Sequence, residues 1–189
     1  MKYDRFVRVY DSTAASIIFL SKAVIDDLTR PLLKCIRIEE SEKGEGKLLG
    51  VATDGRCMHI VDDIDKNVIE TYELTTGNWE VVRRRKISGV WLARISDRDV
   101  EKLYKFDWKK VIPQGNATFK TIFEKFNIKG GNYEIQKLIR SFPEFTAFNI
   151  KYLQQLSNGQ DWDVEWYGPN KSVKFTSDNM TAVIMPMRT

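Results

Sequence analysis

The feature that most constrains the fold is a repeat, because a helix followed by three short strands occurs near both ends of the chain. In the first copy, Ser21 can cap a helix over residues 22–30, whose apolar residues fall on one face. Pro31 should end this helix, since proline lacks the N–H group that the interior of a helix needs. Apolar segments with strand-like alternation then predict strands at 34–40, 48–53 and 57–61.

The second copy begins at Asn149, which can cap a helix with Ile150, Leu153 and Leu156 facing inward. Gly159 is placed to end that helix. Strands are expected to follow at 162–167, 172–176 and 181–187. The repeat predicts an α+β fold with internal pseudo-symmetry.

The segments outside the two copies have less regular patterns. A strand is expected at 6–10, an apolar run of strand length at 14–20, a hairpin with strands at 68–74 and 79–86, and a further strand at 90–95. A short helix is expected over 96–106. The last helix is expected over 118–126, because four apolar residues recur there at helical spacing, and Gly130-Gly131 should end it.

Composition indicates a globular protein that acts outside membranes. The chain is 42% hydrophobic, and it contains no run near the roughly 20 apolar residues that a membrane-spanning helix needs. No apolar core of a secretory signal follows the N-terminus, so we expect a cytoplasmic protein. Two cysteines and one histidine are too few for a structural zinc site, and we expect no metal and no cofactor. A net charge of +4 is compatible with a polyanionic partner without requiring one.

Four short stretches resemble one family in the order in which that family has them. LLGVATDGRCMHI (48–60) is similar to a strand-turn-strand of the bacterial DNA sliding clamp, the beta subunit of DNA polymerase III. VKFTSDNMTAVIMPMR (173–188) resembles the C-terminal strand of that protein. FDWKKVIPQ (106–114) and FNIKYLQQL (148–156) are similar to segments of its middle and last domains. The resemblance implies the DNA clamp fold in a shortened form, because this chain is about half as long as a three-domain clamp subunit.

The resemblance also implies how the chain is organised. We expect one clamp-like domain over 1–189, made of half-units of about 1–113 and 114–189, each with a helix, three strands and an antiparallel sheet, and with the helices on one face. Residues 64–96, which contain the run RRRK, match nothing in the family. Too few residues separate Pro113 from Phe148 for the half-domains that intervene in a full clamp.

A clamp-like function follows from the same resemblance and involves no catalysis. Clamps tether their partners to duplex DNA without reading its sequence, and they capture short peptides of polymerases and clamp loaders in a hydrophobic pocket. Carried over position by position, that pocket would be lined by Thr53, Gly55, Arg56, Cys57, Met58, Pro113, Val183, Met185, Pro186, Met187 and Arg188. Unbranched methionines suit such a pocket because they can repack around different peptides.

Two departures and one structural alternative weaken the pocket assignment. The family usually has His-Arg-Leu after the glycine, where this chain has Arg56-Cys57-Met58, and an apolar residue at the end, where this chain has Thr189. Alternatively, Val183, Met185 and Met187 alternate into the core of the last strand.

The candidate DNA contacts are basic residues that would meet phosphates loosely and with strong salt dependence. They are Lys22 and Arg30 on the first helix, Lys120 and Lys125 on the helix expected over 118–126, Lys151 on the last helix, and Arg83 and Arg85 in the RRRK run. A plainer interpretation is that these lysines form the solvent-exposed faces of amphipathic helices. The RRRK run could equally protect an edge strand against aggregation.

Two other functions remain open from the sequence. A metal-dependent nuclease could use the acidic cluster Asp54, Asp62, Asp63 and Asp65, although turns and loops explain these residues as well. His59 is better explained as a structural residue than as a catalytic one. The second open function is that of an adaptor protein of phage or mobile-element origin, which has a clamp fold but does not encircle DNA. Oligomeric state separates these ideas, because a monomer of this length cannot encircle DNA and a ring would need a homo-oligomer.

Overall fold

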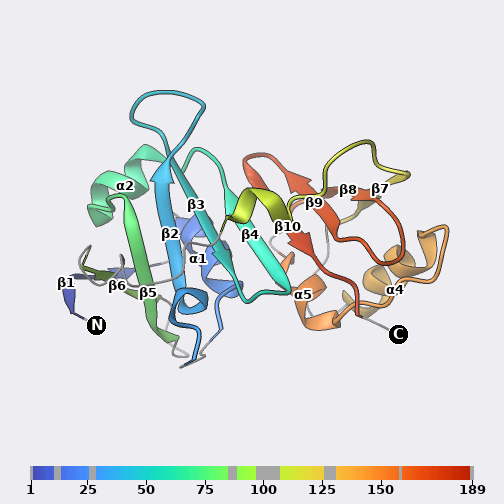
Figure 1. The fold of residues 1–189 in the computed structure, drawn as a ribbon, viewed down its shortest axis with the longest axis horizontal. Helices are drawn as coiled ribbons and strands as arrows, with labels where there is room; N and C mark the ends of the chain where they lie inside the picture. Colours follow the sequence, from blue (N-terminus) through green and yellow to red (C-terminus); the bar gives the residue numbers. More distant parts are fainter. Residues whose placement is uncertain are drawn as a thin grey trace. The chain divides into compact units, whose positions relative to one another are not determined.

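The computed structural model describes residues 2–10, 14–25, 29–84, 89–96, 107–125, 131–157 and 159–187. The chain forms two compact units, Met1–Phe106 and Asp107–Thr189, called here the first and the second unit. Both combine an antiparallel sheet with helices, so the protein is of the α+β class (Figure 1).

The sheet of the first unit has the strand order β1-β6-β5-β2-β3-β4, and every neighbouring pair in it is antiparallel. Helix α1 lies behind β3 and β4 (Figure 1). The described elements of this unit are β1 (Tyr3–Val9), α1 (Ala15–Lys22), the 3-10 helix η2 (Pro31–Lys34), β2 (Cys35–Glu40), β3 (Leu48–Thr53), β4 (Cys57–Val61), α2 (Lys66–Tyr72), β5 (Gly77–Arg84) and β6 (Val90–Ile95).

Helix α1 can approach the sheet closely because β3 carries a glycine beneath it. Phe19 and Leu20 of α1 are buried, and a Cβ atom at Gly50 would lie only 2.4 Å from Cδ1 of Leu20. A side chain at position 50 would displace the end of the Leu20 side chain from this part of the core. Gly50 therefore leaves room for Leu20 against β3.

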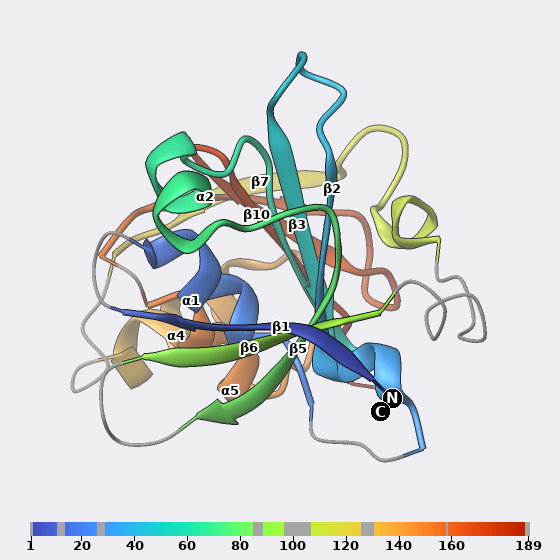
Figure 2. The same cartoon turned by 90° about the vertical axis from the view of Figure 1, so that its left-hand side faces the viewer.

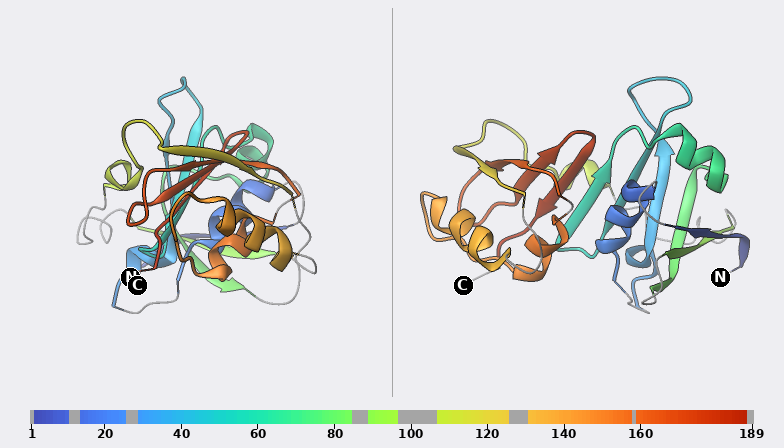
Figure 3. Two further views of the ribbon diagram at one scale, coloured as in Figure 1. Left: turned by 90° about the vertical axis from the view of Figure 1, so that its right-hand side faces the viewer. Right: turned by 180° about the vertical axis from the view of Figure 1, so that it is seen from behind.

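The sheet of the second unit has the order β10-β9-β8-β7. Helix α4 packs on β7 and contacts α5 (Figure 3). Two buried tryptophans anchor the helical side, because Nε1 of Trp162 donates to the Leu156 carbonyl and Nε1 of Trp166 donates to Oγ1 of Thr146. The described elements are the 3-10 helix η3 (Trp108–Val111), β7 (Phe119–Phe123), α4 (Gly131–Ser141), α5 (Ile150–Gln155), β8 (Trp162–Trp166), β9 (Val173–Ser177) and β10 (Met180–Ile184).

Both units share one plan: a strand, a helical segment, and three consecutive antiparallel strands. In the second unit, the first strand β7 pairs directly with β8, the first strand of the meander. In the first unit, β5 and β6 are inserted between β1 and β2. The unmatched segment 64–96 is thus an added helix, α2, and an added hairpin that widens the first sheet. The predicted repeat of a helix and three strands is confirmed.

The strand predictions within the repeat are also confirmed, and so is the cap of the last helix, where Oδ1 of Asn149 accepts from the Lys151 amide at 3.1 Å. The last strand is shorter than expected, since β10 ends at Ile184. Among the described residues, no helix combines the length and the apolar character that crossing a bilayer requires.

Four local predictions are wrong. The first helix is α1 at Ala15–Lys22 rather than 22–30, and Ser21 lies inside it, with its hydroxyl donating to the Ile18 carbonyl. Residues 66–72 form the helix α2 instead of a strand, because the carboxylate of Asp65 caps the Asn67 amide at 2.8 Å. Residues 119–123 form β7 instead of a helix, and Gly131 begins α4 instead of ending a helix. Apart from Ser96, the helix expected over 96–106 lies outside the described residues.

Candidate functional site

The turn between β3 and β4 is fixed by its own side chains. Oδ1 of Asp54 accepts from the amides of Arg56 and Cys57 at 2.8 and 2.7 Å. The hydroxyl of Thr53 accepts from the Gly55 amide at 3.0 Å and donates to the Cys57 carbonyl at 2.8 Å. Gly55 has a φ of 88°, which favours glycine. These residue types are therefore required by the turn itself.

Only part of this hairpin is open to a partner. Gly55 and Arg56 are exposed at the tip, whereas Thr53, Cys57 and Met58 are buried. Burial raises the pKa of the Cys57 thiol well above its usual value, so this cysteine remains neutral and packs as a small apolar group. The surface that the hairpin offers comes from its tip.

The C-terminal segment exposes its methionines. Val183 and Ile184 at the end of β10 are buried, but Met185 and Met187 have exposed fractions of 45% and 56%. The Met187 amide donates to the Ala147 carbonyl at 2.8 Å, which holds the segment beside the loop that precedes α5. Of the three residues predicted to alternate into the core, only Val183 is buried. Pro186 is half-buried, and Arg188 lies outside the described residues.

Two exposed apolar residues near this segment escaped the sequence analysis. Phe145 has an exposed fraction of 78%, and Ile150, which the helical pattern placed inward, one of 48%. Both lie within three residues of Ala147, the acceptor for Met187. Ile150 lies in the stretch FNIKYLQQL, whose resemblance to the clamp family could have drawn attention to it. Nothing in the sequence pointed to Phe145.

The predicted pocket residues are divided between the two units. Thr53, Gly55, Arg56, Cys57 and Met58 belong to the first unit. Pro113, which is half-buried just after η3, belongs to the second unit together with residues 183–188. Each set lies within its own unit.

Among the candidate DNA contacts, those on helices differ in exposure. Lys22 at the end of α1 is half-buried, and the loss of solvent lowers the pKa of its ammonium group. Lys151 on α5 and Arg30, directly before η2, are exposed. Helix α4 adds two exposed basic residues that the sequence analysis missed, Lys137 and Arg140.

The remaining candidate contacts are not on helices. Lys120 lies on β7, and its ammonium group is 2.9 Å from the Glu165 carboxylate. Lys125 follows β7 and is exposed. Arg83 lies in β5, an inner strand of the first sheet, so the edge-strand interpretation of the RRRK run does not apply to the part within β5. Arg85 lies outside the described residues.

The aspartates considered as a metal site each have a structural partner. Besides Asp54 in its turn, these contacts are Asp62 with the Ser41 hydroxyl and Lys43, Asp63 with Lys47, and Asp65 with the Asn67 amide. Within the described ranges, no three histidine, cysteine, aspartate or glutamate side chains come together as a metal site. His59 is buried, with Nδ1 2.8 Å from the Phe19 carbonyl and its ring stacked on that of Phe19. These groups have structural roles in the described part of the chain.

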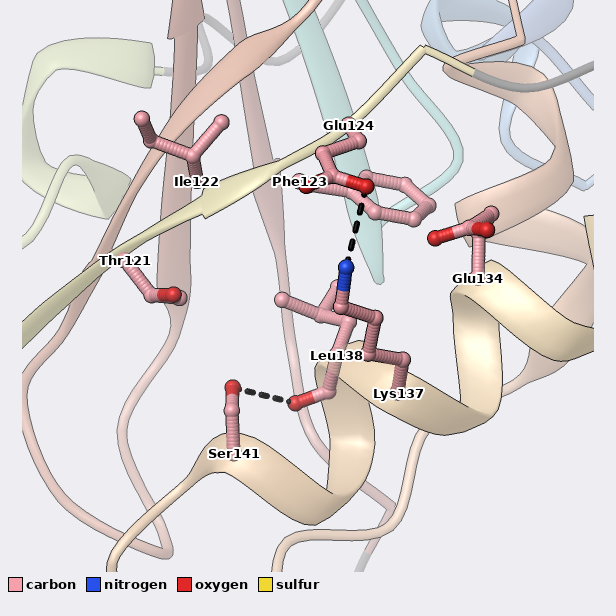
Figure 4. A pocket seen from close by; sticks show the side chains of 8 residues that line it. All are labelled: Thr121, Ile122, Phe123, Glu124, Glu134, Lys137, Leu138 and Ser141. Carbon is pink, nitrogen blue, oxygen red and sulfur yellow. Dashed lines mark hydrogen bonds and ion pairs between the residues drawn. The ribbon is translucent and has the colours of Figure 1, made fainter.

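A small cavity lies between β7 and α4 in the second unit (Figure 4). Its volume is about 60 Å³, far below the roughly 300 Å³ at which ligand pockets begin. The Lys137 ammonium group and the Glu124 carboxylate form an ion pair of 3.0 Å beside it. The cavity is therefore too small for a cofactor or a peptide side chain of ordinary size.

Comparison with known proteins identifies the architecture. No protein-family model matches the sequence, and no curated protein matches it significantly. Solved bacterial sliding clamps, in contrast, superimpose on nearly the whole chain. The beta subunit of DNA polymerase III from Borrelia burgdorferi matches 98% of it with a TM-score of 0.58 and 14% identity. The protein has the DNA clamp fold.

Two further clamps give the same result. The Bacillus subtilis clamp matches 100% of the chain with a TM-score of 0.55 and 14% identity, and the Caulobacter crescentus beta subunit matches 100% with a TM-score of 0.56 and 15% identity. The chain spans about two thirds of these subunits, from 65% in Borrelia to 68% in Caulobacter. The chain therefore has the clamp fold with a strongly diverged sequence.

Proposed function

We propose that this protein is a non-catalytic, clamp-like tether that binds duplex DNA without sequence preference and captures peptides of partner proteins. The observation that carries the proposal is the match of nearly the whole chain to sliding clamps, in which both units take part. We place its action in the cytoplasm, beside replicating or repaired DNA. The fold supports this function over catalysis because the four aspartates considered as a metal site, and His59, have structural partners.

The helices are the proposed DNA-facing elements. Lys22 of α1, Lys151 of α5, and Lys137 and Arg140 of α4 are basic side chains on the helices of their units. Long, flexible cations that meet phosphates through water hold a duplex without fixing its register. Such contacts allow movement along DNA and weaken steeply as salt increases.

The proposed peptide contacts are apolar and lie at exposed places in both units. Met185 and Met187 offer flexible thioether side chains, and Phe145 and Ile150 add apolar surface near the same segment. In the first unit, Gly55 and Arg56 present the tip of the β3–β4 hairpin. Since each unit supplies its own residues, the two contributions are tested by separate variants.

The peptide contact is tested by the double substitution Met185→Ala/Met187→Ala. We expect binding of a clamp-binding peptide from a polymerase or clamp loader to weaken about tenfold or more, because two exposed apolar contacts are lost. Fluorescence anisotropy of the labelled peptide measures the change, and Arg56→Ala tests the hairpin tip in the same way. Tyr133→Ala, an exposed aromatic residue on α4, is the matched control. Unchanged affinity in a folded double variant would refute the peptide assignment.

Encirclement of DNA requires self-association, and each unit has a strand at one end of its sheet, β1 in the first and β7 in the second. We expect a solution mass of several chains and retention on circular duplex DNA that is lost when the circle is cut. Size-exclusion chromatography with light scattering gives the mass, and gel filtration of protein–DNA mixtures measures retention. A monomer that is retained equally on circular and linear DNA would instead identify a non-encircling adaptor with a clamp fold.

A further inference from the structure

Exposed aromatic side chains gather at the β1 end of the first sheet. In this part of the sheet, the strands β1, β6 and β5 lie side by side (Figure 2). Phe6 and Trp91 have exposed fractions of 62% and 42%, and Tyr3 and Tyr10 are exposed as well. The rings of Tyr3 and Phe6 meet edge to face at 5.5 Å. Burial of such rings usually drives folding, so their exposure together indicates a binding surface.

The register of the strands shows that this surface is separate from the core. Phe6 pairs with Ala93, and Arg8 pairs with Trp91, so these residues project from the same face of the sheet. The alternate residues of β1 project from the other face, where Val9 is fully buried. The aromatic surface therefore lies on the side of β1 and β6 that faces away from the core.

A cation lies among the rings. The guanidinium carbon of Arg8 is 4.4 Å from the centroid of the Tyr10 ring and 5.3 Å from that of the Trp91 ring. The nearby acid Glu80 accepts a hydrogen bond from the Tyr3 hydroxyl at 2.5 Å. The surface combines exposed rings with the guanidinium group of Arg8.

We propose that this surface, formed by Tyr3, Phe6, Arg8, Tyr10 and Trp91, binds single-stranded nucleic acid by stacking bases on the aromatic rings. Residues on one face of a strand recur at about 6.6 Å, a spacing that suits the separated bases of an extended strand. Arg8, beside the rings, binds a phosphate.

This activity goes beyond the proposed tethering of duplex DNA and uses a different surface. In a duplex the bases are already stacked on one another, so the aromatic rings cannot reach their faces. The surface therefore distinguishes single strands from duplexes, whereas the helices proposed to face duplex DNA carry no part of it. Failure of one assignment leaves the other standing.

Tryptophan fluorescence offers a direct test, since Trp91 differs from the other four tryptophans. Trp79, Trp108, Trp162 and Trp166 have exposed fractions of at most 8%. We expect oligothymidine of about ten nucleotides to quench the emission of the protein by stacking on Trp91. The variant Trp91→Phe should keep binding in an anisotropy assay with labelled oligothymidine and lose most of the quenching.

Affinity is tested by Phe6→Ala/Trp91→Ala, which removes two of the rings. We expect oligothymidine binding to weaken at least about tenfold, because two bases lose the rings on which they stack. Arg8→Ala should weaken binding and reduce its salt dependence. The control is Tyr133→Ala, which removes an exposed ring of the second unit and should bind like the wild type.

Three outcomes would overturn the proposal. One is unchanged affinity in the folded Phe6→Ala/Trp91→Ala variant, and another is equal competition by duplex DNA for the quenching site. The third is a lower solution mass of that variant without loss of oligothymidine binding, which would identify the surface as a contact between copies of the chain.

Discussion

Glu165 on β8 is held between two lysines. Its carboxylate lies 2.9 Å from the ammonium groups of both Lys174 and Lys120, and it accepts from the Tyr167 hydroxyl at 3.1 Å. The hydrogen bonds from Lys174 and Lys120 lower the pKa of Glu165 from 4.5 to about 2. Lys120 is therefore paired with a carboxylate of its own sheet, as Lys137 is paired with Glu124.

This lowered pKa makes part of the stability of the second unit depend on pH. A carboxylate with a lower pKa in the folded state stabilises the fold above its ordinary pKa of 4.5, and this contribution is lost as the pH falls towards 2. Glu165→Gln should thus reduce the free energy of unfolding by about 1 kcal/mol at about pH 7, with a smaller loss at about pH 3. Urea denaturation at both pH values measures it.

The exposed Asp163 on the same strand supplies the control, as Asp163→Asn removes a carboxylate that makes no such pair of contacts. It should leave the stability at neutral pH nearly unchanged. An equal loss in both variants at both pH values would show that the contacts of Glu165 add nothing specific.

At the scale of single residues, the sequence predicted those features that depend on hydrogen bonds between residues close together in the chain. The turn at Asp54-Gly55 and the cap at Asn149 follow from hydrogen bonds within a few residues, and the structure contains both. The burial of Cys57 and Met58 and the exposure of Ile150 depend on what packs against them. Residues that pack together can be far apart in the sequence, so the pattern of one segment could not predict this burial or exposure.

At the scale of elements, β7 shows how two periodicities compete. Apolar residues at helical spacing predicted a helix, but within β7 the residues alternate: Phe123 is buried and Ile122 is exposed. Pairing with β8 overrides the local helical pattern. The adjacent α4 was missed because Gly131, expected to end a helix, lies at the start of one, although Ile135, Leu138 and Phe142 bury a helical face.

If residues 119–123 form a strand, substitutions at the neighbouring residues Ile122 and Phe123 should have different effects on stability. In a strand, Phe123→Ala should destabilise the protein by roughly 3–5 kcal/mol, because it opens a cavity in the core. Ile122→Ala should change stability by less than about 0.5 kcal/mol, because Ile122 has an exposed fraction of 60%. Chemical denaturation of both variants measures the difference. Comparable losses at both positions would support the helix and contradict β7.

At the scale of the whole molecule, the sequence predicted the repeat and, through four short stretches, the clamp fold. It did not predict that β5 and β6 widen the first sheet, because their insertion between β1 and β2 is a long-range pairing. It placed Lys151 correctly on a helix, but Lys120 and Lys125, also expected on a helix, lie in and just after β7. Residues 119–123 form a strand, and the helix of this region is α4 at Gly131–Ser141. We therefore propose Lys137 and Arg140 of α4 as DNA contacts in place of Lys120 and Lys125.

The number of phosphates contacted by the molecule can be measured from salt dependence. For duplex DNA, the logarithm of affinity falls with the logarithm of salt with a slope of about 0.9 per neutralised phosphate. Lys151→Ala on α5 should therefore reduce the slope by about 0.9 and weaken binding similarly for all sequences.

Lys171→Ala, an exposed lysine in the turn between β8 and β9, is the matched control and should leave the slope unchanged. Anisotropy titrations of a labelled duplex over a series of salt concentrations give both slopes. If the two variants lower the slope equally, the charge of the molecule as a whole attracts DNA, and the helices have no special part in binding it.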